Sequence, residues 1–383
     1  MLAMSGARHE HLEGLLYRTG VVSDGPICFS SFGPKRDTPP AYCREATLSI
    51  TVRYPGRACL LGEHCDWAGG ASLTVPLAEG VRVVAEPAAR DLRVRSAMEG
   101  RLLEGRWPTE GTVDRAGGTL RFVPAAAAAL RARGIRPPPA LLWVDADLPP
   151  GRGFSSSAAL CLALLDALAR HAGVVLEPAE LAALATHVER DLLGVPCGRL
   201  DPLACVAGAP VLLRWGPDGR APLERVRPRV PMHIVIAAFA TPRDTSAILA
   251  ALHAHFHADL RCPEHPEATA AVRSAIATFG SATEAGAAAL QAGDLAGLGR
   301  EMDRCQDAYE DAERVIPALE APHLRAAVAG LRRRGALGAK FSGAGGDGSV
   351  IALYDDVQAA CDARRWLDGQ PAMQAWIRTL EVA

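Results

Sequence analysis

The sequence has few lysines, no closely spaced cysteine pairs and no long apolar run. Lysine occurs only as Lys35 and Lys340, so the basic charge is almost entirely arginine. The ten cysteines stand singly, without a C-x-x-C pair or histidines at zinc spacing, which argues against a zinc site or a disulfide framework. No stretch reaches the ~20 apolar residues of a membrane-spanning helix. We therefore expect a cytoplasmic protein without a membrane partner.

A strong net charge is also missing. The formal charge is −2 at pH 7, which gives no electrostatic reason to expect a nucleic acid as partner. The first residues, M-L-A-M-S-G-A-R-H-E-H, lack the apolar core of a signal peptide. With 383 residues the chain is long enough for two domains. We expect an irregular extension over residues 1–45 and domains over 46–228 and 229–383.

What is present is a stretch in which an apolar run gives way to glycines and serines. The run Leu141–Leu148 ends at Pro149 and Pro150, and Gly151 and Gly153 then permit positive φ before three serines open an alanine-rich helix. Such a helix start exposes unpaired N–H groups that suit a phosphate chain. The stretch lacks the lysine of a P-loop and the third glycine of the dinucleotide fingerprint. A capped helix after a turn is the alternative.

A second stretch, Pro55–Pro76, concentrates polar groups between apolar segments. Arg57, Glu63, His64 and Asp66 fall within a turn-rich segment. Carboxylates and imidazole bind hydroxyl groups in fixed directions, so these residues are candidates for recognising a polyhydroxylated ligand. A solvated hairpin with an incidental ion pair is the alternative.

Two further features admit two interpretations each. Asp201 lies between a G-V-P-C-G turn and an apolar helix, so it is either a helix-capping carboxylate or part of a reaction centre. Residues 335–350 read G-A-L-G-A-K-F-S-G-A-G-G-D-G-S-V. Their many glycines leave the backbone without side chains, so the segment could close over a phosphate or turn tightly between strands.

The hydrophobic pattern predicts strands grouped before helices, which is an α+β arrangement. Strands are expected at 46–54, 73–78, 81–86, 92–96, 117–122, 141–148, 211–213 and 233–240 and after the last glycine segment. Helices are expected at 124–133, from 155 onward, at 178–193, up to 279, and at 283–292, 295–308 and 324–334.

Taken together in chain order, these segments resemble the GHMP kinase superfamily, named for galactokinase, homoserine kinase, mevalonate kinase and phosphomevalonate kinase. Pro55–Pro76 keeps the galactokinase form of the first motif, G-R-x-x-L-x-G-E-H-x-D-aromatic-x-G-G. The glycine-serine stretch is similar to the second motif and residues 338–353 to the third, and Glu189–Asp201 includes G-x-P-C-G-x-x-D. The resemblance implies a two-domain α+β fold. Its N-terminal domain has a mixed sheet with helices, its C-terminal domain is ferredoxin-like, and the active site lies in the cleft between them.

The resemblance also implies a role for each candidate residue. Asp201 would accept the proton of an attacking hydroxyl, and Arg57 would keep Asp201 ionised and stabilise developing negative charge. Ser157 and Glu189 would hold Mg²⁺, which prefers oxygen ligands. The implied ATP-binding residues are Pro150, Gly151, Gly153, Ser155, Ser156, Ser157, Ala158, Gly343 and Gly345. The implied acceptor-binding residues are Glu63, His64, Asp66 and Gly198.

The implied activity is ATP-dependent phosphorylation of a sugar hydroxyl, with the anomeric hydroxyl favoured, by a monomer or homodimer. A mevalonate-type or other polyol kinase is the alternative within enzymes, and a non-catalytic sugar sensor is the alternative outside them. The sequence departs from galactokinase in two ways. Its second half has no recognisable tyrosine-bearing substrate segment, and single residues of the motifs differ. These residues are Cys59, Trp67, Pro202, Asp347 and Ser349.

Overall fold

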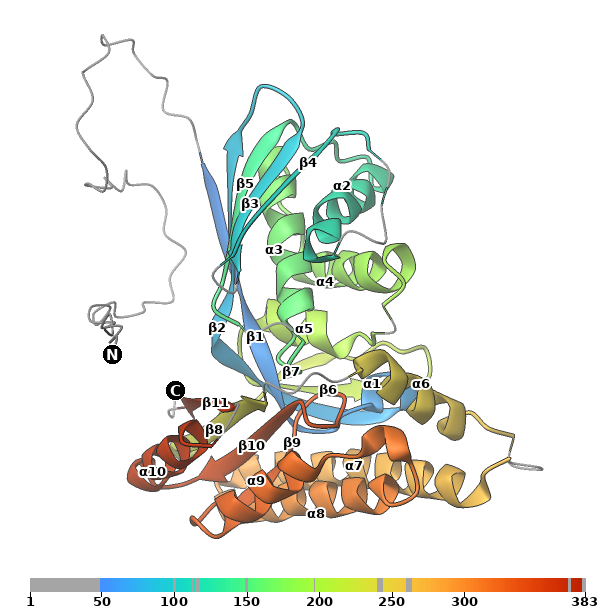
Figure 1. Cartoon of the computed structure of the whole chain (residues 1–383), viewed down its shortest axis with the longest axis vertical. Coiled ribbons are helices and arrows are strands. Elements are labelled where there is room, and N and C mark those ends of the chain that lie inside the picture. The colour runs from blue at the N-terminus through green and yellow to red at the C-terminus, as the bar shows by residue number, and fades with distance from the viewer. Residues whose placement is uncertain are drawn as a thin grey trace, which may run out of the picture. The chain divides into compact units, whose positions relative to one another are not determined.

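The computed structural model describes residues 49–98, 101–111, 113, 118–148, 151–195, 197–239, 244–259, 264–370 and 373–380. The extension expected over residues 1–45 and the nucleotide-binding candidate Pro150 therefore lie outside the described residues. The chain divides into the units Met1–Glu45 and Ala46–Ala383, and the second unit contains two β-sheets (Figure 1). The first sheet ends at Arg225 and the second begins at Met232, which brackets the expected domain boundary at 228–229. The boundary itself stays a prediction.

The first sheet has seven strands in the order β4-β3-β5-β2-β6-β7, with β1 paired to β2. Only β3 and β5 run parallel, so the sheet is mixed. Its central strand is β2, which pairs along its length with β1, β5 and β6. The strands are β1 (Ile50–Leu61), β2 (Gly70–Pro87), β3 (Leu92–Met98), β4 (Arg101–Trp107), β5 (Ala140–Ala146), β6 (Val211–Trp215) and β7 (Leu223–Arg225).

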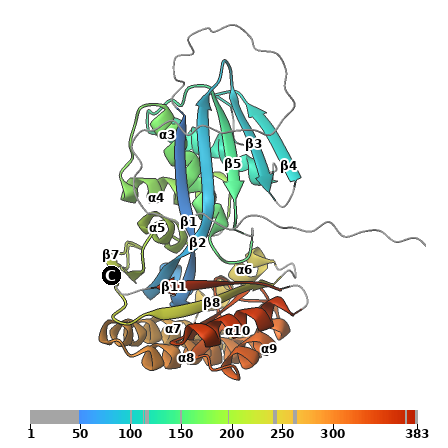
Figure 2. The same cartoon turned by 90° about the vertical axis from the view of Figure 1, so that its left-hand side faces the viewer.

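Helices cover one face of this sheet: α3 packs on β1 and β2, as Figure 2 shows, and α4 packs on α3. Every residue of α3 from Ala158 to Ala169 is buried, as expected for a helix that is apolar all round. The charged residue among them, Asp166, accepts hydrogen bonds from Tyr54 Oη (2.8 Å) and Arg170 Nε (2.7 Å). The helical segments are α1 (Cys65–Ala68), a 3₁₀ turn (Gly118–Arg121), α2 (Phe122–Ala132), α3 (Ser156–His171), α4 (Pro178–His187), a π turn (Val188–Leu192) and α5 (Leu200–Ala207).

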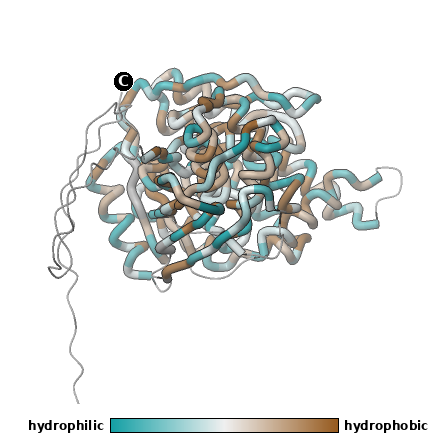
Figure 3. The backbone as a smooth tube through the Cα atoms, turned by 90° about the horizontal axis from the view of Figure 1, so that it is seen from above, coloured by the Kyte–Doolittle hydropathy of each residue, from teal (hydrophilic) through white to brown (hydrophobic). Residues whose placement is uncertain are grey.

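The second sheet is antiparallel, in the order β11-β8-β10-β9, and carries its own helices (Figure 1). In Figure 3 many of the hydrophobic segments, in brown, lie in the middle of the molecule. No helix among the described residues is both long and apolar enough to cross a membrane. The strands are β8 (Met232–Phe239), β9 (Gly338–Phe341), β10 (Ser349–Tyr354) and β11 (Met373–Leu380). The helices are α6 (Thr245–Phe256), α7 (Pro266–Ala292), α8 (Leu295–Glu313), a 3₁₀ turn (Pro317–Leu319), α9 (Pro322–Arg332) and α10 (Val357–Asp368).

The two sheets meet where β1 ends and the glycine loop after β9 begins. Cys59 N donates a hydrogen bond to Ser342 Oγ (3.1 Å), and the Ser342 hydroxyl donates to Cys59 O (3.3 Å). Helix α7 also approaches β1 closely, because a Cβ on Gly286 would lie 2.3 Å from Leu61 Cδ1. Segments far apart in sequence are thereby held side by side at one edge of the first sheet.

Several expected elements differ from the structure. The strand expected at 117–122 is, over its described part, a 3₁₀ turn followed by the start of α2. The first strand does not end near Tyr54 but continues through bulges to Leu61, because β2 offers it a pairing partner over that length. The helices expected on either side of residue 281 form one helix, α7. Strands β4, β7, β9 and β11 and helices α1 and α10 were not expected.

A non-local carboxylate caps helix α9. Asp347 Oδ1 accepts a hydrogen bond from Leu324 N (2.8 Å), and Asp347 Oδ2 pairs with His323 Nδ1 (2.7 Å). We expect Asp347→Ala to lower the free energy of unfolding by about 1–2 kcal/mol, because a helix-terminal N–H group loses its acceptor. Urea denaturation measures this change. His323→Ala removes only the exposed partner and should cost less than about 1 kcal/mol. Equal midpoints for Asp347→Ala and the native chain would contradict the capping role.

Candidate functional site

A cavity of about 310 Å³ lies where β1, the N-terminus of α3, the start of α5 and the loop after β9 come together. Most of the residues implicated by the sequence line it, although they come from distant parts of the chain. These are Arg57, Glu63, His64, Asp66, Gly151, Gly153, Ser155, Ser156, Ser157, Glu189, Gly198, Asp201 and Gly343.

Two implicated residues lie elsewhere. Ala158 is buried inside α3 and contributes to the core. Gly345 lies behind the loop, where a Cβ would be 2.7 Å from Cε2 of Tyr309. The bare backbone at Gly345 is therefore explained by its packing against an aromatic ring.

The central contact of the cavity is an ion pair between Arg57 and Asp201. Arg57 is 4% exposed and donates from Nε (3.0 Å) and Nη2 (2.5 Å) to the same oxygen, Asp201 Oδ1. Burial disfavours the charged guanidinium, but the adjacent Asp201 carboxylate outweighs burial and raises the pKa of Arg57. Asp201 lies in the first turn of α5, whose N-cap is Arg199, so Asp201 is not the helix cap.

Arg57 reaches this position because β1 is bulged between Pro55 and Arg57. The neighbouring Gly56 lies against the glycine-serine turn, where a Cβ would be 2.6 Å from Phe154 O. Arg57 also donates from its backbone N to Phe154 O (3.2 Å) and from Nη1 to Gly153 O (2.6 Å). One side chain thus joins β1, the turn before α3 and the start of α5.

The N-terminus of α3 opens into the cavity beside two glycine segments. Gly151 and Gly153 have φ of 71° and 84°, and Ser155, the N-cap, has φ 61° and makes no side-chain cap hydrogen bond. The expected position of the helix start is correct, but no cap bond from Ser155 accompanies it. The third motif touches the second here, since a Cβ on Gly343 would lie 3.0 Å from Gly153 Cα. Such a concave backbone surface at a helix N-terminus favours anions.

The buried Glu189 and the half-buried Ser157 place two side-chain oxygens next to this surface. Ser157 hydrogen-bonds the Glu189 carboxylate, and Glu189 Oε2 is buried with no hydrogen-bond partner among the described residues. Burial raises the pKa of Glu189 to about 7. The hydrogen bond from Ser157 opposes this shift, and the negative charge of Asp201 adds to it. A carboxylate and a hydroxyl fit Mg²⁺, which usually takes only one or two protein ligands. No cluster of three or more His, Cys, Asp or Glu suited to a metal occurs among the described residues.

Asp66 occupies a slot formed by the turn before α5. Its Oδ2 accepts a hydrogen bond from Leu200 N (3.2 Å) and fills the space in front of Gly198, where a Cβ would lie 1.6 Å from that oxygen. Burial and the negative charge of Asp201 raise the pKa of Asp66 to about 6. Gly198 is therefore required by the position of Asp66.

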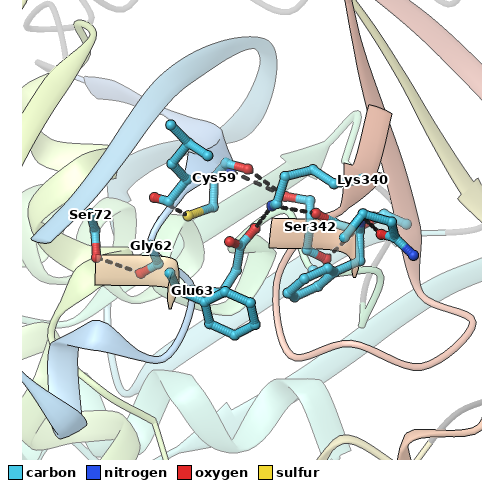
Figure 4. A network of polar contacts seen from close by, with 12 residues as sticks. Cys59, Gly62, Glu63, Ser72, Lys340 and Ser342 are labelled. Atoms are coloured by element: carbon cyan, nitrogen blue, oxygen red, sulfur yellow. Dashed lines mark hydrogen bonds and ion pairs between the residues drawn. The ribbon is translucent and has the colours of Figure 1, made fainter. Parts of the chain in front are cut away.

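Glu63 and His64 lie on the turn between β1 and α1. His64 has the left-handed φ of 68°, which few side chains adopt. Figure 4 shows Glu63 reaching toward Lys340 of β9, with which it forms a buried ion pair. These two residues are 277 positions apart, so no sequence pattern connects them.

The apolar wall of the cavity was not expected from the sequence. Val81, Phe122, Val144, Ala146 and Leu160 line it, together with Trp67 and, from α6, Thr245 and Leu249. The aliphatic and aromatic residues of the first sheet and its helices look like ordinary core in the sequence, so periodicity could not single them out. Trp67 stacks on His253 of α6 at 3.9 Å between ring centroids, which holds α6 against the cavity.

Comparison with known proteins agrees with this architecture. The model for the N-terminal domain of GHMP kinases matches residues 121–209, and the model for their C-terminal domain matches residues 287–368. A galactokinase of Mycobacterium tuberculosis (strain H37Rv) is 34% identical over 169 residues, or 42% of this chain and 45% of that protein. A galactokinase of Pyrococcus furiosus is 31% identical over 159 residues, or 42% of this chain and 44% of that protein. The matches thus span less than half the length of these relatives.

Solved structures agree over a larger part of the chain. Lactococcus lactis galactokinase complexed with galactose has a TM-score of 0.70 at 21% identity, covering 87% of this chain and 93% of that one. L. major mevalonate kinase in complex with R-mevalonate has a TM-score of 0.67 at 20% identity, covering 88% and 98%. The expected two-domain α+β fold of GHMP kinases is confirmed, and the chain matches the models for both the N-terminal and the C-terminal domain of that family.

Proposed function

We propose that the chain is an ATP-dependent kinase that transfers a phosphoryl group to a hydroxyl of a sugar or sugar-like polyol, with the anomeric hydroxyl favoured. The observation that supports this most is the convergence of the Arg57–Asp201 pair and the Ser157–Glu189 pair on one cavity. Phosphoryl transfer needs a base, a cationic group that stabilises negative charge, a helix N-terminus that binds anions and oxygen ligands for a metal ion.

In this proposal Asp201 is the general base. Both hydrogen bonds from Arg57 to the Asp201 carboxylate end on Oδ1, so Oδ2 is the oxygen available to the acceptor hydroxyl. Asp201 takes the hydroxyl proton, the hydroxyl oxygen bonds to the γ-phosphorus, and the bond from that phosphorus to the β–γ bridging oxygen breaks to release ADP. A positioned base supplies ~10² to 10⁴ in rate, and alignment of donor and acceptor supplies much of the rest.

The nucleotide fits the side of the cavity formed by α3 and the apolar wall. The amides around Gly151, Gly153 and Gly343 and the N-terminus of α3 suit the phosphates. Val81, Phe122 and Val144 offer a surface suited to a flat base. Ser157 and Glu189 would hold Mg²⁺, which when bound neutralises phosphate charge.

The acceptor fits the other side, near Glu63, His64 and Asp66. These residues bind hydroxyl groups well and lie near Asp201 in the same cavity. The similarity to galactokinases favours a sugar. A mevalonate-type acceptor is the second candidate, because the fold also matches mevalonate kinases.

The direct test is release of ADP from ATP and Mg²⁺ over a panel of sugars, sugar acids, inositols and mevalonate. We expect the largest kcat/KM with a neutral sugar. Phosphate on the anomeric oxygen is then read from the ³¹P–¹H couplings of the product. Turnover of mevalonate alone would support the second candidate, and tight sugar binding without ADP release would indicate a sensor.

Asp201→Asn should lower kcat by at least ~10²-fold, because an amide cannot take the hydroxyl proton. The affinity for MgATP, measured by calorimetry, should change little, since the nucleotide is held by other groups. Asp218→Asn, on an exposed turn, is the control and should leave kcat unchanged. Near-native turnover by Asp201→Asn would exclude Asp201 as the base.

Gly198→Ala should weaken acceptor binding by roughly tenfold or more, equivalent to about 1.4 kcal/mol. The new methyl group would overlap Asp66 Oδ2 and displace the carboxylate. Acceptor KM and MgATP KM, measured separately, should show the change only in the former. Gly369→Ala is a matched control, because Gly369 has φ −80° and the nearest atom would be 3.4 Å away. An unchanged acceptor KM in Gly198→Ala would contradict a role for Asp66.

A further inference from the structure

Lys340 is fully buried although the chain uses arginine for nearly all its positive charge. Its side chain has 0% exposure in β9 and forms an ion pair with Glu63 Oε1. Its ammonium also donates to Phe341 O (2.6 Å) and lies 4.4 Å from the centroid of the Phe341 ring. A buried ammonium is costly unless it is paired, so this pair fixes both side chains.

Glu63 is held at one oxygen only. Its side chain is 2% exposed, and its Oε1 forms the ion pair with Lys340 Nζ. Its Oε2 is buried and has no hydrogen-bond partner among the described residues. Glu313 has the same pattern, with Arg325 and Ala321 N on Oε1 and no partner on Oε2, but Glu313 is not among the residues that line the cavity. Glu63 differs because it lies in the cavity wall beside His64 and Asp66.

Hydrogen bonds between side chains and backbone groups hold the segments that carry Glu63 and Lys340 in place (Figure 4). Ser342 bridges to Cys59 on β1, and Gly62 O accepts a hydrogen bond from Ser72 Oγ (2.7 Å). On the other side Phe341 N donates to Gln306 Oε1 (2.9 Å). The turn that carries Glu63 is therefore tied to the second sheet next to Lys340.

We propose that Lys340 is a positioning residue that holds Glu63 Oε1 across the two sheets so that Oε2 is presented to one hydroxyl of the acceptor. This inference rests on the proposed function and deepens it. A hydroxyl can donate to the unpaired oxygen, whereas a carboxylate cannot and is repelled by Glu63. The Lys340–Glu63 pair therefore selects a neutral polyol over a hydroxy acid.

The test measures binding rather than turnover. Lys340→Met removes the ammonium and keeps the length of the side chain. We expect it to weaken binding of the best neutral sugar of the acceptor panel, with D-galactose as first probe, by at least tenfold in calorimetry with a non-hydrolysable ATP analogue present. Binding of MgATP should stay within twofold.

Arg325→Met is the matched control, because it also removes the cationic partner of a buried carboxylate, Glu313. It should lower the thermal midpoint as Lys340→Met does but leave sugar binding within twofold. Folded Lys340→Met with native sugar affinity, or with equal losses for sugar and MgATP, would overturn the positioning role.

If Lys340→Met does not fold, the double variant Glu63→Gln/Lys340→Met replaces both charges and leaves none unpaired. It should fold and bind MgATP, but bind the sugar at least tenfold more weakly, and native sugar affinity would overturn the inference. Sugar binding by the native chain without ADP release would refute only the kinase proposal. A native chain that binds mevalonate and no neutral sugar would refute the selection proposed for Lys340.

Discussion

The buried guanidinium of Arg57 is the contact on which the geometry of the cavity depends. It donates to the backbone carbonyl of Gly153 in the turn before α3 and to the carboxylate of Asp201 on α5, while the backbone N of Arg57 donates to Phe154 O in the same turn. A buried charge is tolerated only with such partners, so β1, which carries Arg57, must stay together with the two segments that supply them. Because β1 pairs with β2 from Ile50 to Leu61, the strand positions Arg57, and Arg57 in turn positions the elements that line the cavity around it.

The sequence predicted those parts of the site that are marked by local chemistry. Glycines that need positive φ, such as Gly151 and Gly343, and charged residues inside apolar segments stand out without knowledge of the fold. What could not be predicted depends on partners far along the chain. Strand β1 continues past Pro55 because β2 pairs with it, and Lys340 becomes the partner of Glu63 only when the second sheet meets the first. The apolar wall around Phe122 has the same composition as the core.

Three departures from the galactokinase pattern have structural explanations. At Cys59 the backbone pairs with Ser342, and the buried thiol contacts Leu61 O (3.2 Å). Asp347 caps α9, and Ser349 at the start of β10 donates to Ser342 O (2.8 Å) across the loop between β9 and β10. Each substitution is compensated by a contact between segments. These residues therefore report on how the second sheet is assembled and say little about the acceptor.

The charge balance of the cavity suits a nucleotide that is bound together with a cation. Glu63 forms an ion pair with Lys340, and Asp201 forms one with Arg57. Glu189 has no such cationic partner, and burial and the negative charge of Asp201 raise its pKa to about 7. A triphosphate bound beside Glu189 would add negative charge to a site that already disfavours it. A divalent cation removes this repulsion, because Ser157, the unpaired Glu189 oxygen and phosphate oxygens are the donors it prefers. In the proposed function, nucleotide and cation are thus expected to bind together.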